Sequence, residues 1–473
     1  MTEHTGQETI EGEDGHLVKK VEETTTVQEA PGTTLSETAT AKTTDPVESV
    51  EADTRPSTPL ERGMRRMLAA FAYRDFRVQW IGACSSAIGT WMQIVAQNWL
   101  VLSLTNSPFY LGLDAFLQQL PIILFTLVGG VFADRYDRRK TLLASQYVQM
   151  FTSGALAVLM YLHVVQVWHI MALSFMTGVA QSFGGPAYQS LLPSLVDKKD
   201  LPNAVALNSI QFNLARVLGP LLFAVTLATF LKWGYNEPQA MNAAFFLNAL
   251  SFFVVIGTLM SLHVKHVPTT HTRRMRDELQ GGLHYVRHHN SLVALIVLAA
   301  ATTFLGFAIL TFLPVFAQRV FHGSASTYSR LMAFSGAGSI VGALVVAWLG
   351  KFRRMGLTAL LMQAIYGVLI LAFAMSRVMW LSQILLFFTG AALMMVFSTV
   401  TSLVQLIAPN EMRGRVMSIY MVAFRGGMPL GSLAGGYLAT IIGAPRVIAI
   451  NGALLVLVAA YFLLVRSHGV REA

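Results

Sequence analysis

The sequence predicts an all-α membrane protein with twelve transmembrane helices in two pseudo-symmetric six-helix bundles. Three observations lead to this prediction. The chain of 473 residues is 54% hydrophobic and only 12% charged, and its mean hydropathy is positive, which is unusual for a soluble domain. Apolar runs of about 20 residues, long enough to cross a bilayer, recur along it. Basic residues gather in alternate loops between these runs.

The apolar runs form two sets of six, separated by about 25 polar residues. The first set covers about residues 77–102, 109–133, 141–164, 167–191, 203–231 and 239–264. The second covers about residues 292–317, 328–350, 356–376, 379–407, 414–441 and 444–466. We therefore expect an N-terminal bundle over residues 75–265, a linker over 266–290 and a C-terminal bundle over 291–467.

Residues 1–60 differ sharply from the rest, with 13 acidic and 4 basic residues and few large apolar ones. Such a segment cannot bury a core, so we expect a disordered acidic tail, either passive or regulatory. It contains no apolar run, which argues against a cleavable signal peptide. In the linker, Leu279, Leu283 and Val286 recur at helical spacing, which predicts a short amphipathic helix on the membrane surface.

Loop charge predicts the orientation of the chain. The loops after spans 2, 4, 6, 8 and 10 are basic, for example DRYDRRK at residues 134–140 and RGR at 413–415. By the positive-inside rule these loops and both termini are cytoplasmic, in a multi-pass protein of the cell membrane. Because the bases lie in short loops between apolar runs, we do not expect nucleic-acid binding. The single cysteine, Cys84, excludes an intrachain disulfide.

The two halves repeat each other. The fourth span of each half ends in Gln, three residues and Pro (189–193 and 405–409), and the fifth contains Arg, three residues and Pro (216–220 and 425–429). These matching marks predict a duplicated six-helix unit, with parallel repeats about an axis normal to the membrane.

The loop GGVFADRYDRRK at residues 129–140, together with twelve spans in a duplicated arrangement, resembles the major facilitator superfamily. The ADRYDRR form and the later RGR are similar to the bacterial branch of macrolide efflux and enterobactin export proteins. The resemblance implies that the second and eleventh spans pack together and that an acid after span 2 latches the halves. The latch residues would be Gly130, Asp134, Arg135, Arg138, Arg139, Arg413 and Arg415. The alternative is a loop that only anchors topology. Asp137 stands where the superfamily prefers Gly, and a local pairing with Arg138 or Arg139 is its simplest role.

Two arginines fall near the bilayer midplane, where a charge is costly and usually faces the protein interior. Arg216 and Arg425 could bind an anionic substrate, or could bond helix carbonyls and brace the kinks at the nearby prolines. Gly219 and Pro220 resemble part of the superfamily's fifth-helix antiporter motif. Polar residues on the first and fifth spans could line a central cavity: Gln93, Gln97, Asn208 and Gln211.

After residue 60 the chain has 12 acidic residues, and only Asp114 falls within a span. A carboxyl group inside the bilayer can load and release a proton, so Asp114 is the candidate for proton coupling. The alternative is an acid near the membrane interface that only caps polar groups. We find no P-loop, HExxH or G-x-S-x-G motif, and the linker histidines 284, 288 and 289 favour a solvated face over a metal site. We therefore expect no enzyme activity, cofactor or metal.

The function that these features favour is secondary active transport. We expect a monomer in the lipid bilayer that exports lipophilic or amphiphilic small molecules, drugs or a siderophore, in exchange for protons. The expected mechanism is a rocker switch, in which two bundles alternate around a midplane site. A transporter-like sensor without flux, or an importer of a small anionic metabolite, remains the alternative.

Overall fold

In the computed structural model, residues 7–11, 17–21, 68–263, 275–350 and 354–464 are described. The chain divides into two units, residues 1–57 and 58–473, which we treat separately. In the first, strand β1 (Gln7–Glu11) pairs antiparallel with β2 (Leu17–Val21), and Thr9 lies opposite Lys19. An isolated two-stranded hairpin is marginally stable. This hairpin occupies part of the segment for which the sequence predicts disorder. The rest of that tail lies outside the described residues, so the prediction of a disordered tail stays a prediction.

The second unit begins its helical part with the short turn η1 (Ala69–Ala72) and six long helices. These are α2 (Arg74–Thr105), α3 (Pro108–Arg135), α4 (Arg138–Tyr161), α5 (Val167–Leu191, continued by η2, Leu192–Ser194), α6 (Leu201–Lys232) and α7 (Glu237–Met260). They pack mainly on one another and form the N-terminal bundle.

The linker carries helix α8 (Met275–Arg287), and the C-terminal bundle follows. Its first span is a series of segments, α9 (Asn290–Ala301), the π-helical turn η3 (Thr302–Gly306), α10 (Ala308–Val315) and the π-helical turn η4 (Phe316–Val320). The remaining helices are α11 (Ala325–Leu349), α12 (Met355–Met375), α13 (Met379–Ile407), α14 (Arg413–Ile442) and α15 (Ala444–Leu464).

The predicted twelve spans are thus confirmed, since the described residues form twelve long helical segments, six in each bundle. Among the described residues, nine are long and apolar enough to cross a membrane by composition alone. Helices α2, α5 and α14 are the exceptions because they carry more polar and small residues. Since a polar residue on a membrane helix usually faces the protein interior, these three helices are the first place to look for a site.

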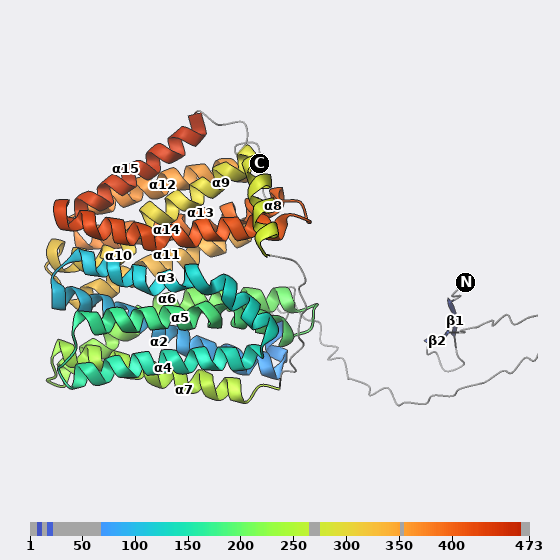
Figure 1. Cartoon of the computed structure of the whole chain (residues 1–473), viewed down its shortest axis with the longest axis horizontal. Coiled ribbons are helices and arrows are strands. Elements are labelled where there is room, and N and C mark those ends of the chain that lie inside the picture. The colour runs from blue at the N-terminus through green and yellow to red at the C-terminus, as the bar shows by residue number, and fades with distance from the viewer. Residues whose placement is uncertain (1–6, 12–16, 22–67, 264–274, 351–353, 465–473) are drawn as a thin grey trace, which may run out of the picture. The chain divides into compact units, whose positions relative to one another are not determined.

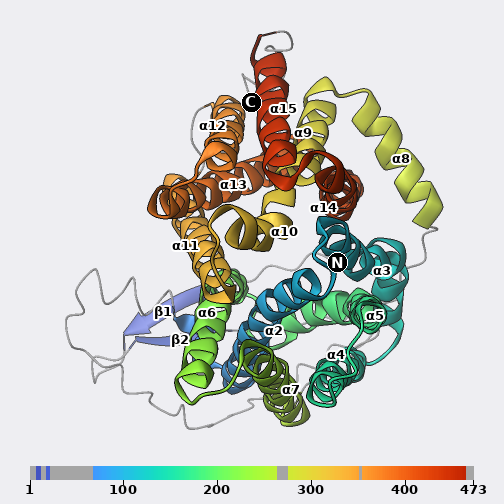
Figure 2. The same ribbon diagram turned by 90° about the vertical axis from the view of Figure 1, so that its left-hand side faces the viewer.

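The two bundles meet along two pairs of helices, as Figures 1 and 2 show. Helix α3 packs along α14, and helix α6 packs along α11. Small residues allow the first approach: a Cβ atom on Gly112 would lie 3.3 Å from the Cα of Gly436, and one on Gly436 would lie 3.0 Å from the carbonyl oxygen of Pro108. Such contacts bring helix backbones together in membrane proteins.

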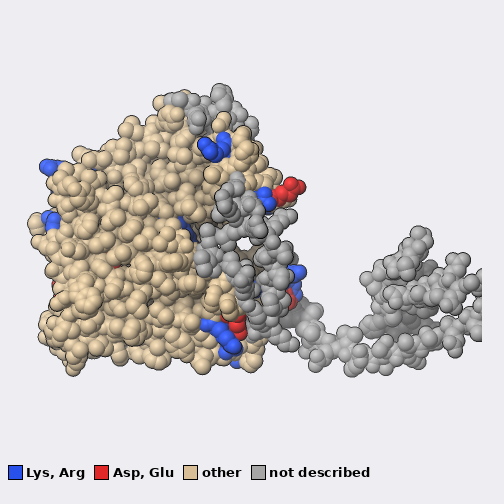
Figure 3. Space-filling view, viewed as in Figure 1, with Lys and Arg blue, Asp and Glu red and all other residues tan. Residues whose placement is uncertain are grey.

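The charged residues gather at the ends of the helices, while the middle of the surface in Figure 3 is almost entirely uncharged. We call the end that carries residues 136–140, 195–200, 354 and 408–415 the basic end, and the opposite end the far end. At the basic end, Tyr73 donates hydrogen bonds to Asp200 (2.7 Å) and Asp197 (2.9 Å), and so ties the start of α2 to the loop before α6.

Asp137, for which the sequence suggests only a local pairing with Arg138 or Arg139, is the N-cap of α4. Its carboxylate accepts hydrogen bonds from the backbone N–H groups of Arg139 (2.9 Å) and Lys140 (3.2 Å). An N-cap aspartate satisfies backbone donors that the first helical turn leaves free. The guanidinium groups nearby bond elsewhere: Arg138 donates to the carbonyl oxygen of Ser190, and Arg139 to that of Met260.

Candidate functional site

The one acidic residue that the sequence places within a span is buried. Asp114 on α3 is 4% exposed. Its carboxylate accepts hydrogen bonds from the hydroxyl of Ser174 on α5 (2.5 Å) and from the amide of Gln97 on α2 (2.8 Å). Among the described residues no basic side chain pairs with it. The carboxylate is enclosed by three helices, and its role in proton coupling and the alternative of an acid that only caps polar groups both stay predictions.

A chain of side-chain amides leads to this carboxylate. Asn248 on α7 donates to the amide oxygen of Gln93 (2.6 Å), and Gln93 donates in turn to that of Gln97 (3.5 Å). Ser153 on α4 also bonds to Gln93 (2.6 Å). Because aligned hydrogen bonds polarise one another, the chain directs donor groups towards Asp114.

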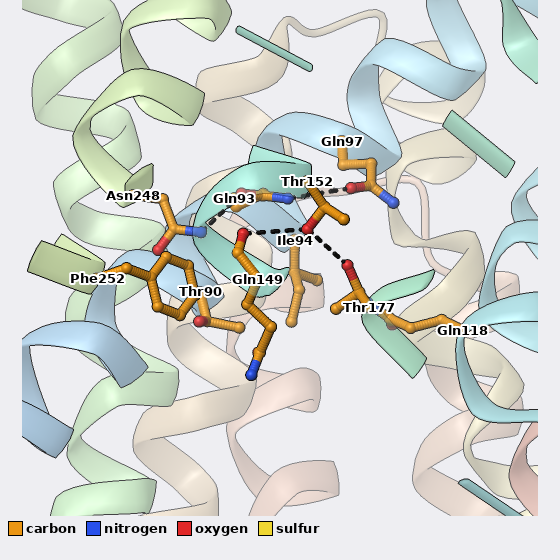
Figure 4. Close-up of a pocket in the computed structure, with 10 residues that line it drawn as sticks. All are labelled: Thr90, Gln93, Ile94, Gln97, Gln118, Gln149, Thr152, Thr177, Asn248 and Phe252. Atoms are coloured by element: carbon orange, nitrogen blue, oxygen red, sulfur yellow. Dashed lines mark hydrogen bonds between the residues drawn. The ribbon is translucent and has the colours of Figure 1, made fainter. Parts of the chain in front are cut away.

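A small cavity lies beside this chain in the interior of the N-terminal bundle, as Figure 4 shows. Its volume is about 20 Å³, which is room for roughly one water molecule. Side chains from α2, α3, α4, α5 and α7 line it, and most are polar: Thr90, Gln93, Ile94, Gln97, Gln118, Gln149, Thr152, Thr177, Asn248 and Phe252. Gln93 and Gln97 therefore bond inside one bundle, whereas the sequence alone led us to expect them in the cavity between the halves.

The opposite side of α2 turns towards the C-terminal bundle. The guanidinium carbon of Arg216 on α6 lies 5.3 Å from the ring centre of Trp91, a cation–π distance. Gly219 makes this pairing possible, since a Cβ there would lie 2.8 Å from the nitrogen of Met92 and would also overlap Trp91. Nearby, Arg216 borders α11, because a Cβ on Gly336 would lie 2.8 Å from its carbonyl oxygen.

Neither midplane arginine shows the bracing bonds that the sequence left open. Within the described residues, Arg216 and Arg425 have no hydrogen bond or ion pair. Arg425 is exposed on α14. Asn208 and Gln211, by contrast, are tied inside the N-terminal bundle, because the Tyr188 hydroxyl of α5 bonds to both side chains.

Only some side chains of the predicted latch are among the described residues. Gly130, Asp134 and Arg135 belong to α3, but their side chains lie outside the described residues, so the latch stays a prediction. The partner residues on α14 bond within their own half: Arg413 donates to the carbonyl oxygen of Gln405 (3.1 Å), and Arg415 contacts Met412 and the glycines of α8.

Contacts at the far end were missed by reasoning from the sequence. In the part of the chain that the structure describes, the hydrogen bonds that join the two bundles lie there. Asn98 donates to the hydroxyl of Tyr328 (3.0 Å), whose ring stacks on Trp99 at 6.5 Å. Arg319 donates to the side chain of Asn106 (2.9 Å), and Glu237 accepts from the backbone N–H of Ala325 (3.1 Å). The only sequence signal was isolated polar residues near span ends.

No group of three or more His, Cys, Asp or Glu side chains that could hold a metal ion occurs among the described residues. The polar groups found among the described residues are one buried acid, neutral amides and hydroxyls, and two arginines without acidic partners. Within the same residues, no acids, bases or nucleophiles pair at one depth as they would in an enzyme.

Comparison with known proteins agrees with this picture. Residues 66–472 match the sequence profile of the family described as transmembrane secretion effector. The staphyloferrin A transporter of Staphylococcus aureus is 27% identical, over 77% of this chain and 89% of that protein. The enterobactin exporter of Citrobacter koseri is 25% identical, over 82% and 91%, and macrolide efflux protein A of Streptococcus pyogenes is 22% identical, over 81% and 94%.

Solved structures share the fold at low identity. A D-xylose–proton symporter has a TM-score of 0.66 at 15% identity, over 85% of this chain and 98% of that one. A bacterial homologue of the human lysosomal transporter Spinster, inward-facing and unoccupied, has a TM-score of 0.64 at 13% identity, over 82% and 96%. Twelve helices in two bundles, a buried polar site and a match that spans nearly the whole helical region lead to one conclusion. The chain is a multi-pass membrane transporter that belongs to the transmembrane secretion effector family of the major facilitator superfamily.

Proposed function

We propose that this transporter exports lipophilic or amphiphilic small molecules, such as drugs or a siderophore, in exchange for protons. The bundles would rock about a site near the bilayer midplane. The protein would act as a monomer in the cell membrane, with the basic end and both termini in the cytoplasm, because basic loops are retained on that side.

The observation that carries the proton coupling is the surroundings of Asp114. It is the only acidic residue inside the spans predicted from the sequence, and it is 4% exposed. Its hydrogen-bond partners are the neutral Gln97 and Ser174. An acid held by neutral groups can exist with or without its proton, whereas one paired to an arginine is held in the ionised form. A change in its charge would alter the hydrogen bonds that join α2, α3 and α5.

Arg216 on α6 favours a substrate that carries a negative or electron-rich group. Arg216 lies over Trp91, and no acid pairs with it within the described residues. An arginine near the midplane needs a partner, and an amphiphilic anion supplies one while its apolar part contacts the aromatic ring. Relatives of the chain are named as a staphyloferrin A transporter, an enterobactin exporter and a macrolide efflux protein, and these names support an amphiphilic substrate.

The test is flux in proteoliposomes that contain the full chain, with ethidium, a macrolide and a siderophore as probes. A pH gradient, acidic on the side that receives the probe, should speed the export of at least one of them. Asp114→Asn should abolish the effect of the gradient and keep downhill exchange. Asp75→Asn is the matched control, because Asp75 lies at the basic end and pairs with Arg74.

Two results would contradict the proposal. Equal rates with and without the gradient in the unaltered protein would exclude proton coupling. The absence of flux for all probes, with binding retained, would favour a sensor without transport.

A further inference from the structure

The cavity beside the hydrogen-bonded amides of Gln93 and Gln97 is lined by the N-terminal bundle, and no described residue of the C-terminal bundle contributes to it. Its lining comes from α2, α3, α4, α5 and α7, all of one bundle. On α2, Gln93 and Gln97 turn towards it, while Trp91 and Asn98 turn towards α6 and the C-terminal bundle. The helix thus separates two polar regions.

The cavity begins next to Asp114 and extends towards the basic end. Gln97, which donates to Asp114, also lines the cavity. Gln118 lies one helical turn further along α3 than Asp114, and Thr177 lies one turn further along α5 than Ser174. Both of these helices run from the far end to the basic end, so the cavity lies on the basic side of the carboxylate.

Polar groups continue from the cavity in the same direction. On α4, Gln149 accepts a hydrogen bond from Gln181 of α5 (3.0 Å) and donates to the hydroxyl of Ser145 (3.2 Å), one turn closer to the basic end. The amide oxygen of Gln146 is buried and has no partner among the described residues. A buried acceptor without a protein partner is usually bonded to water.

The C-terminal bundle also contains buried polar groups, for example Thr302, which donates to Gln363 (2.8 Å), but within the described residues none of them leads to an acidic side chain. Its buried hydroxyl groups mostly bond the carbonyl of their own helix, as Ser329 does with Ala325 (3.0 Å) and Ser339 with Ser335 (3.0 Å). No acidic residue falls within its predicted spans. Polar residues inside a membrane bundle are expensive and mark ion or substrate pathways. Within the described residues, the polar series that reaches an acidic residue is therefore the one in the N-terminal bundle.

We propose that the cavity holds water and is part of a proton route through the interior of the N-terminal bundle, between Asp114 and the basic end. The proton that drives export would thus leave the carboxylate towards the basic end without entering the space between the bundles where the substrate binds. This inference rests on the proposed proton-coupled export. The helices packed against α3 are α2, α4, α5, α10 and α14, and no charged side chain on them contacts Asp114 within the described residues. The water and the two neutral partners are then its proton contacts.

The test follows hydrogen exchange at the carboxyl group, which needs no substrate. The full chain in lipid nanodiscs is transferred from H₂O to D₂O, and the infrared C=O band of protonated Asp114 is assigned by its loss in Asp114→Asn. Thr152 and Thr177 bond to each other across the cavity (3.0 Å). Thr152→Val with Thr177→Val keeps the side-chain shape and removes both hydroxyls. We expect hydrogen exchange at Asp114 to be about tenfold slower or more in the double variant, since the loss of each hydroxyl removes a hydrogen bond from the route.

Thr226→Val on α6 is the matched control, because its hydroxyl is in the same bundle and bonds the carbonyl of Leu222 (2.9 Å). In this control, the Asp114 carboxyl should exchange at the same rate as in the unaltered protein. The same rate in the double variant and the unaltered protein would overturn the route. This outcome is distinguishable from failure of the proposed function. Flux that does not depend on the pH gradient refutes proton coupling, whatever the exchange rate. An unchanged exchange rate in the double variant refutes the route, even where coupling holds.

Discussion

Replacing Gly219 by alanine should lower the stability of the protein, although alanine is the better helix former. The new Cβ would lie 2.8 Å from the nitrogen of Met92 and 2.9 Å from the carbonyl oxygen of Ile88, and it would overlap the Cβ of Trp91. All three neighbours are fixed by the backbone of α2. The two helices must therefore separate by about 1–1.5 Å to regain ordinary contacts of ~3.5–4.0 Å.

Two opposing effects determine the magnitude. Overpacking in a close-packed interior costs about 1–3 kcal/mol, and we expect the upper part of that range because no flexible side chain can move aside. The intrinsic helix preference of alanine over glycine returns about 1 kcal/mol. The net loss at Gly219 should be about 1–2 kcal/mol.

Gly257→Ala on α7 is the matched control. Nothing lies within 4 Å of a Cβ at this position, so only the helix preference acts and the variant should gain up to about 1 kcal/mol. The two alanine variants should differ by about 2–3 kcal/mol, which corresponds to roughly 2–4 °C in unfolding temperature for a helical unit of this length.

The assay is thermal unfolding of the purified proteins in one detergent at one scan rate, because membrane proteins commonly unfold irreversibly. If Gly219→Ala unfolds at the same temperature as Gly257→Ala or higher, α6 does not approach α2 as closely as the structure has it, and the support for Trp91 beneath Arg216 is lost.

Three further predictions follow from single side chains. Asp137→Ala should cost about 0.5–2 kcal/mol because α4 loses its N-cap, while Asp137→Ser should restore most of the unfolding temperature. The hydrogen bond to Asp200 holds the pKa of the Tyr73 hydroxyl well above its usual value, so the group stays protonated where ordinary tyrosines ionise. Tyr73→Phe should leave the tyrosinate absorbance that appears between about pH 9 and pH 11 unchanged, and a loss of amplitude would contradict that hydrogen bond. Tyr328→Phe removes a hydrogen bond between the bundles and should shift the population towards opening at the far end, by about 2- to 10-fold in spin-label distance measurements. The control, Tyr420→Phe, removes a hydrogen bond to Thr401 (2.7 Å) within the C-terminal bundle and should leave that population unchanged.

Much of the fold could be predicted because a bilayer leaves a chain few choices. Backbone groups inside it must bond within helices or closed barrels, so each long apolar run predicts a helix. The boundaries of α13, residues 379–407, agree with the predicted span to the residue. The first span of the C-terminal bundle was less predictable. Its two π-helical turns at residues 302–306 and 316–320 depend on how neighbouring helices pack, and an apolar run carries no signal for them.

The candidate site shows where sequence reasoning stops. The sequence by itself determined that Asp114 is the only acid within a span and that polar residues accompany it on the first and fifth spans. Only the tertiary structure decided that Gln97 and Ser174 hold the carboxylate, and that Gln93 faces the interior of one bundle while Trp91 faces the other half. Residues two positions apart on a helix point in very different directions, and the rotation of the helix about its axis is set by packing against helices distant in sequence. The sequence orders the polar residues along α2, and the packed bundle determines what each of them contacts.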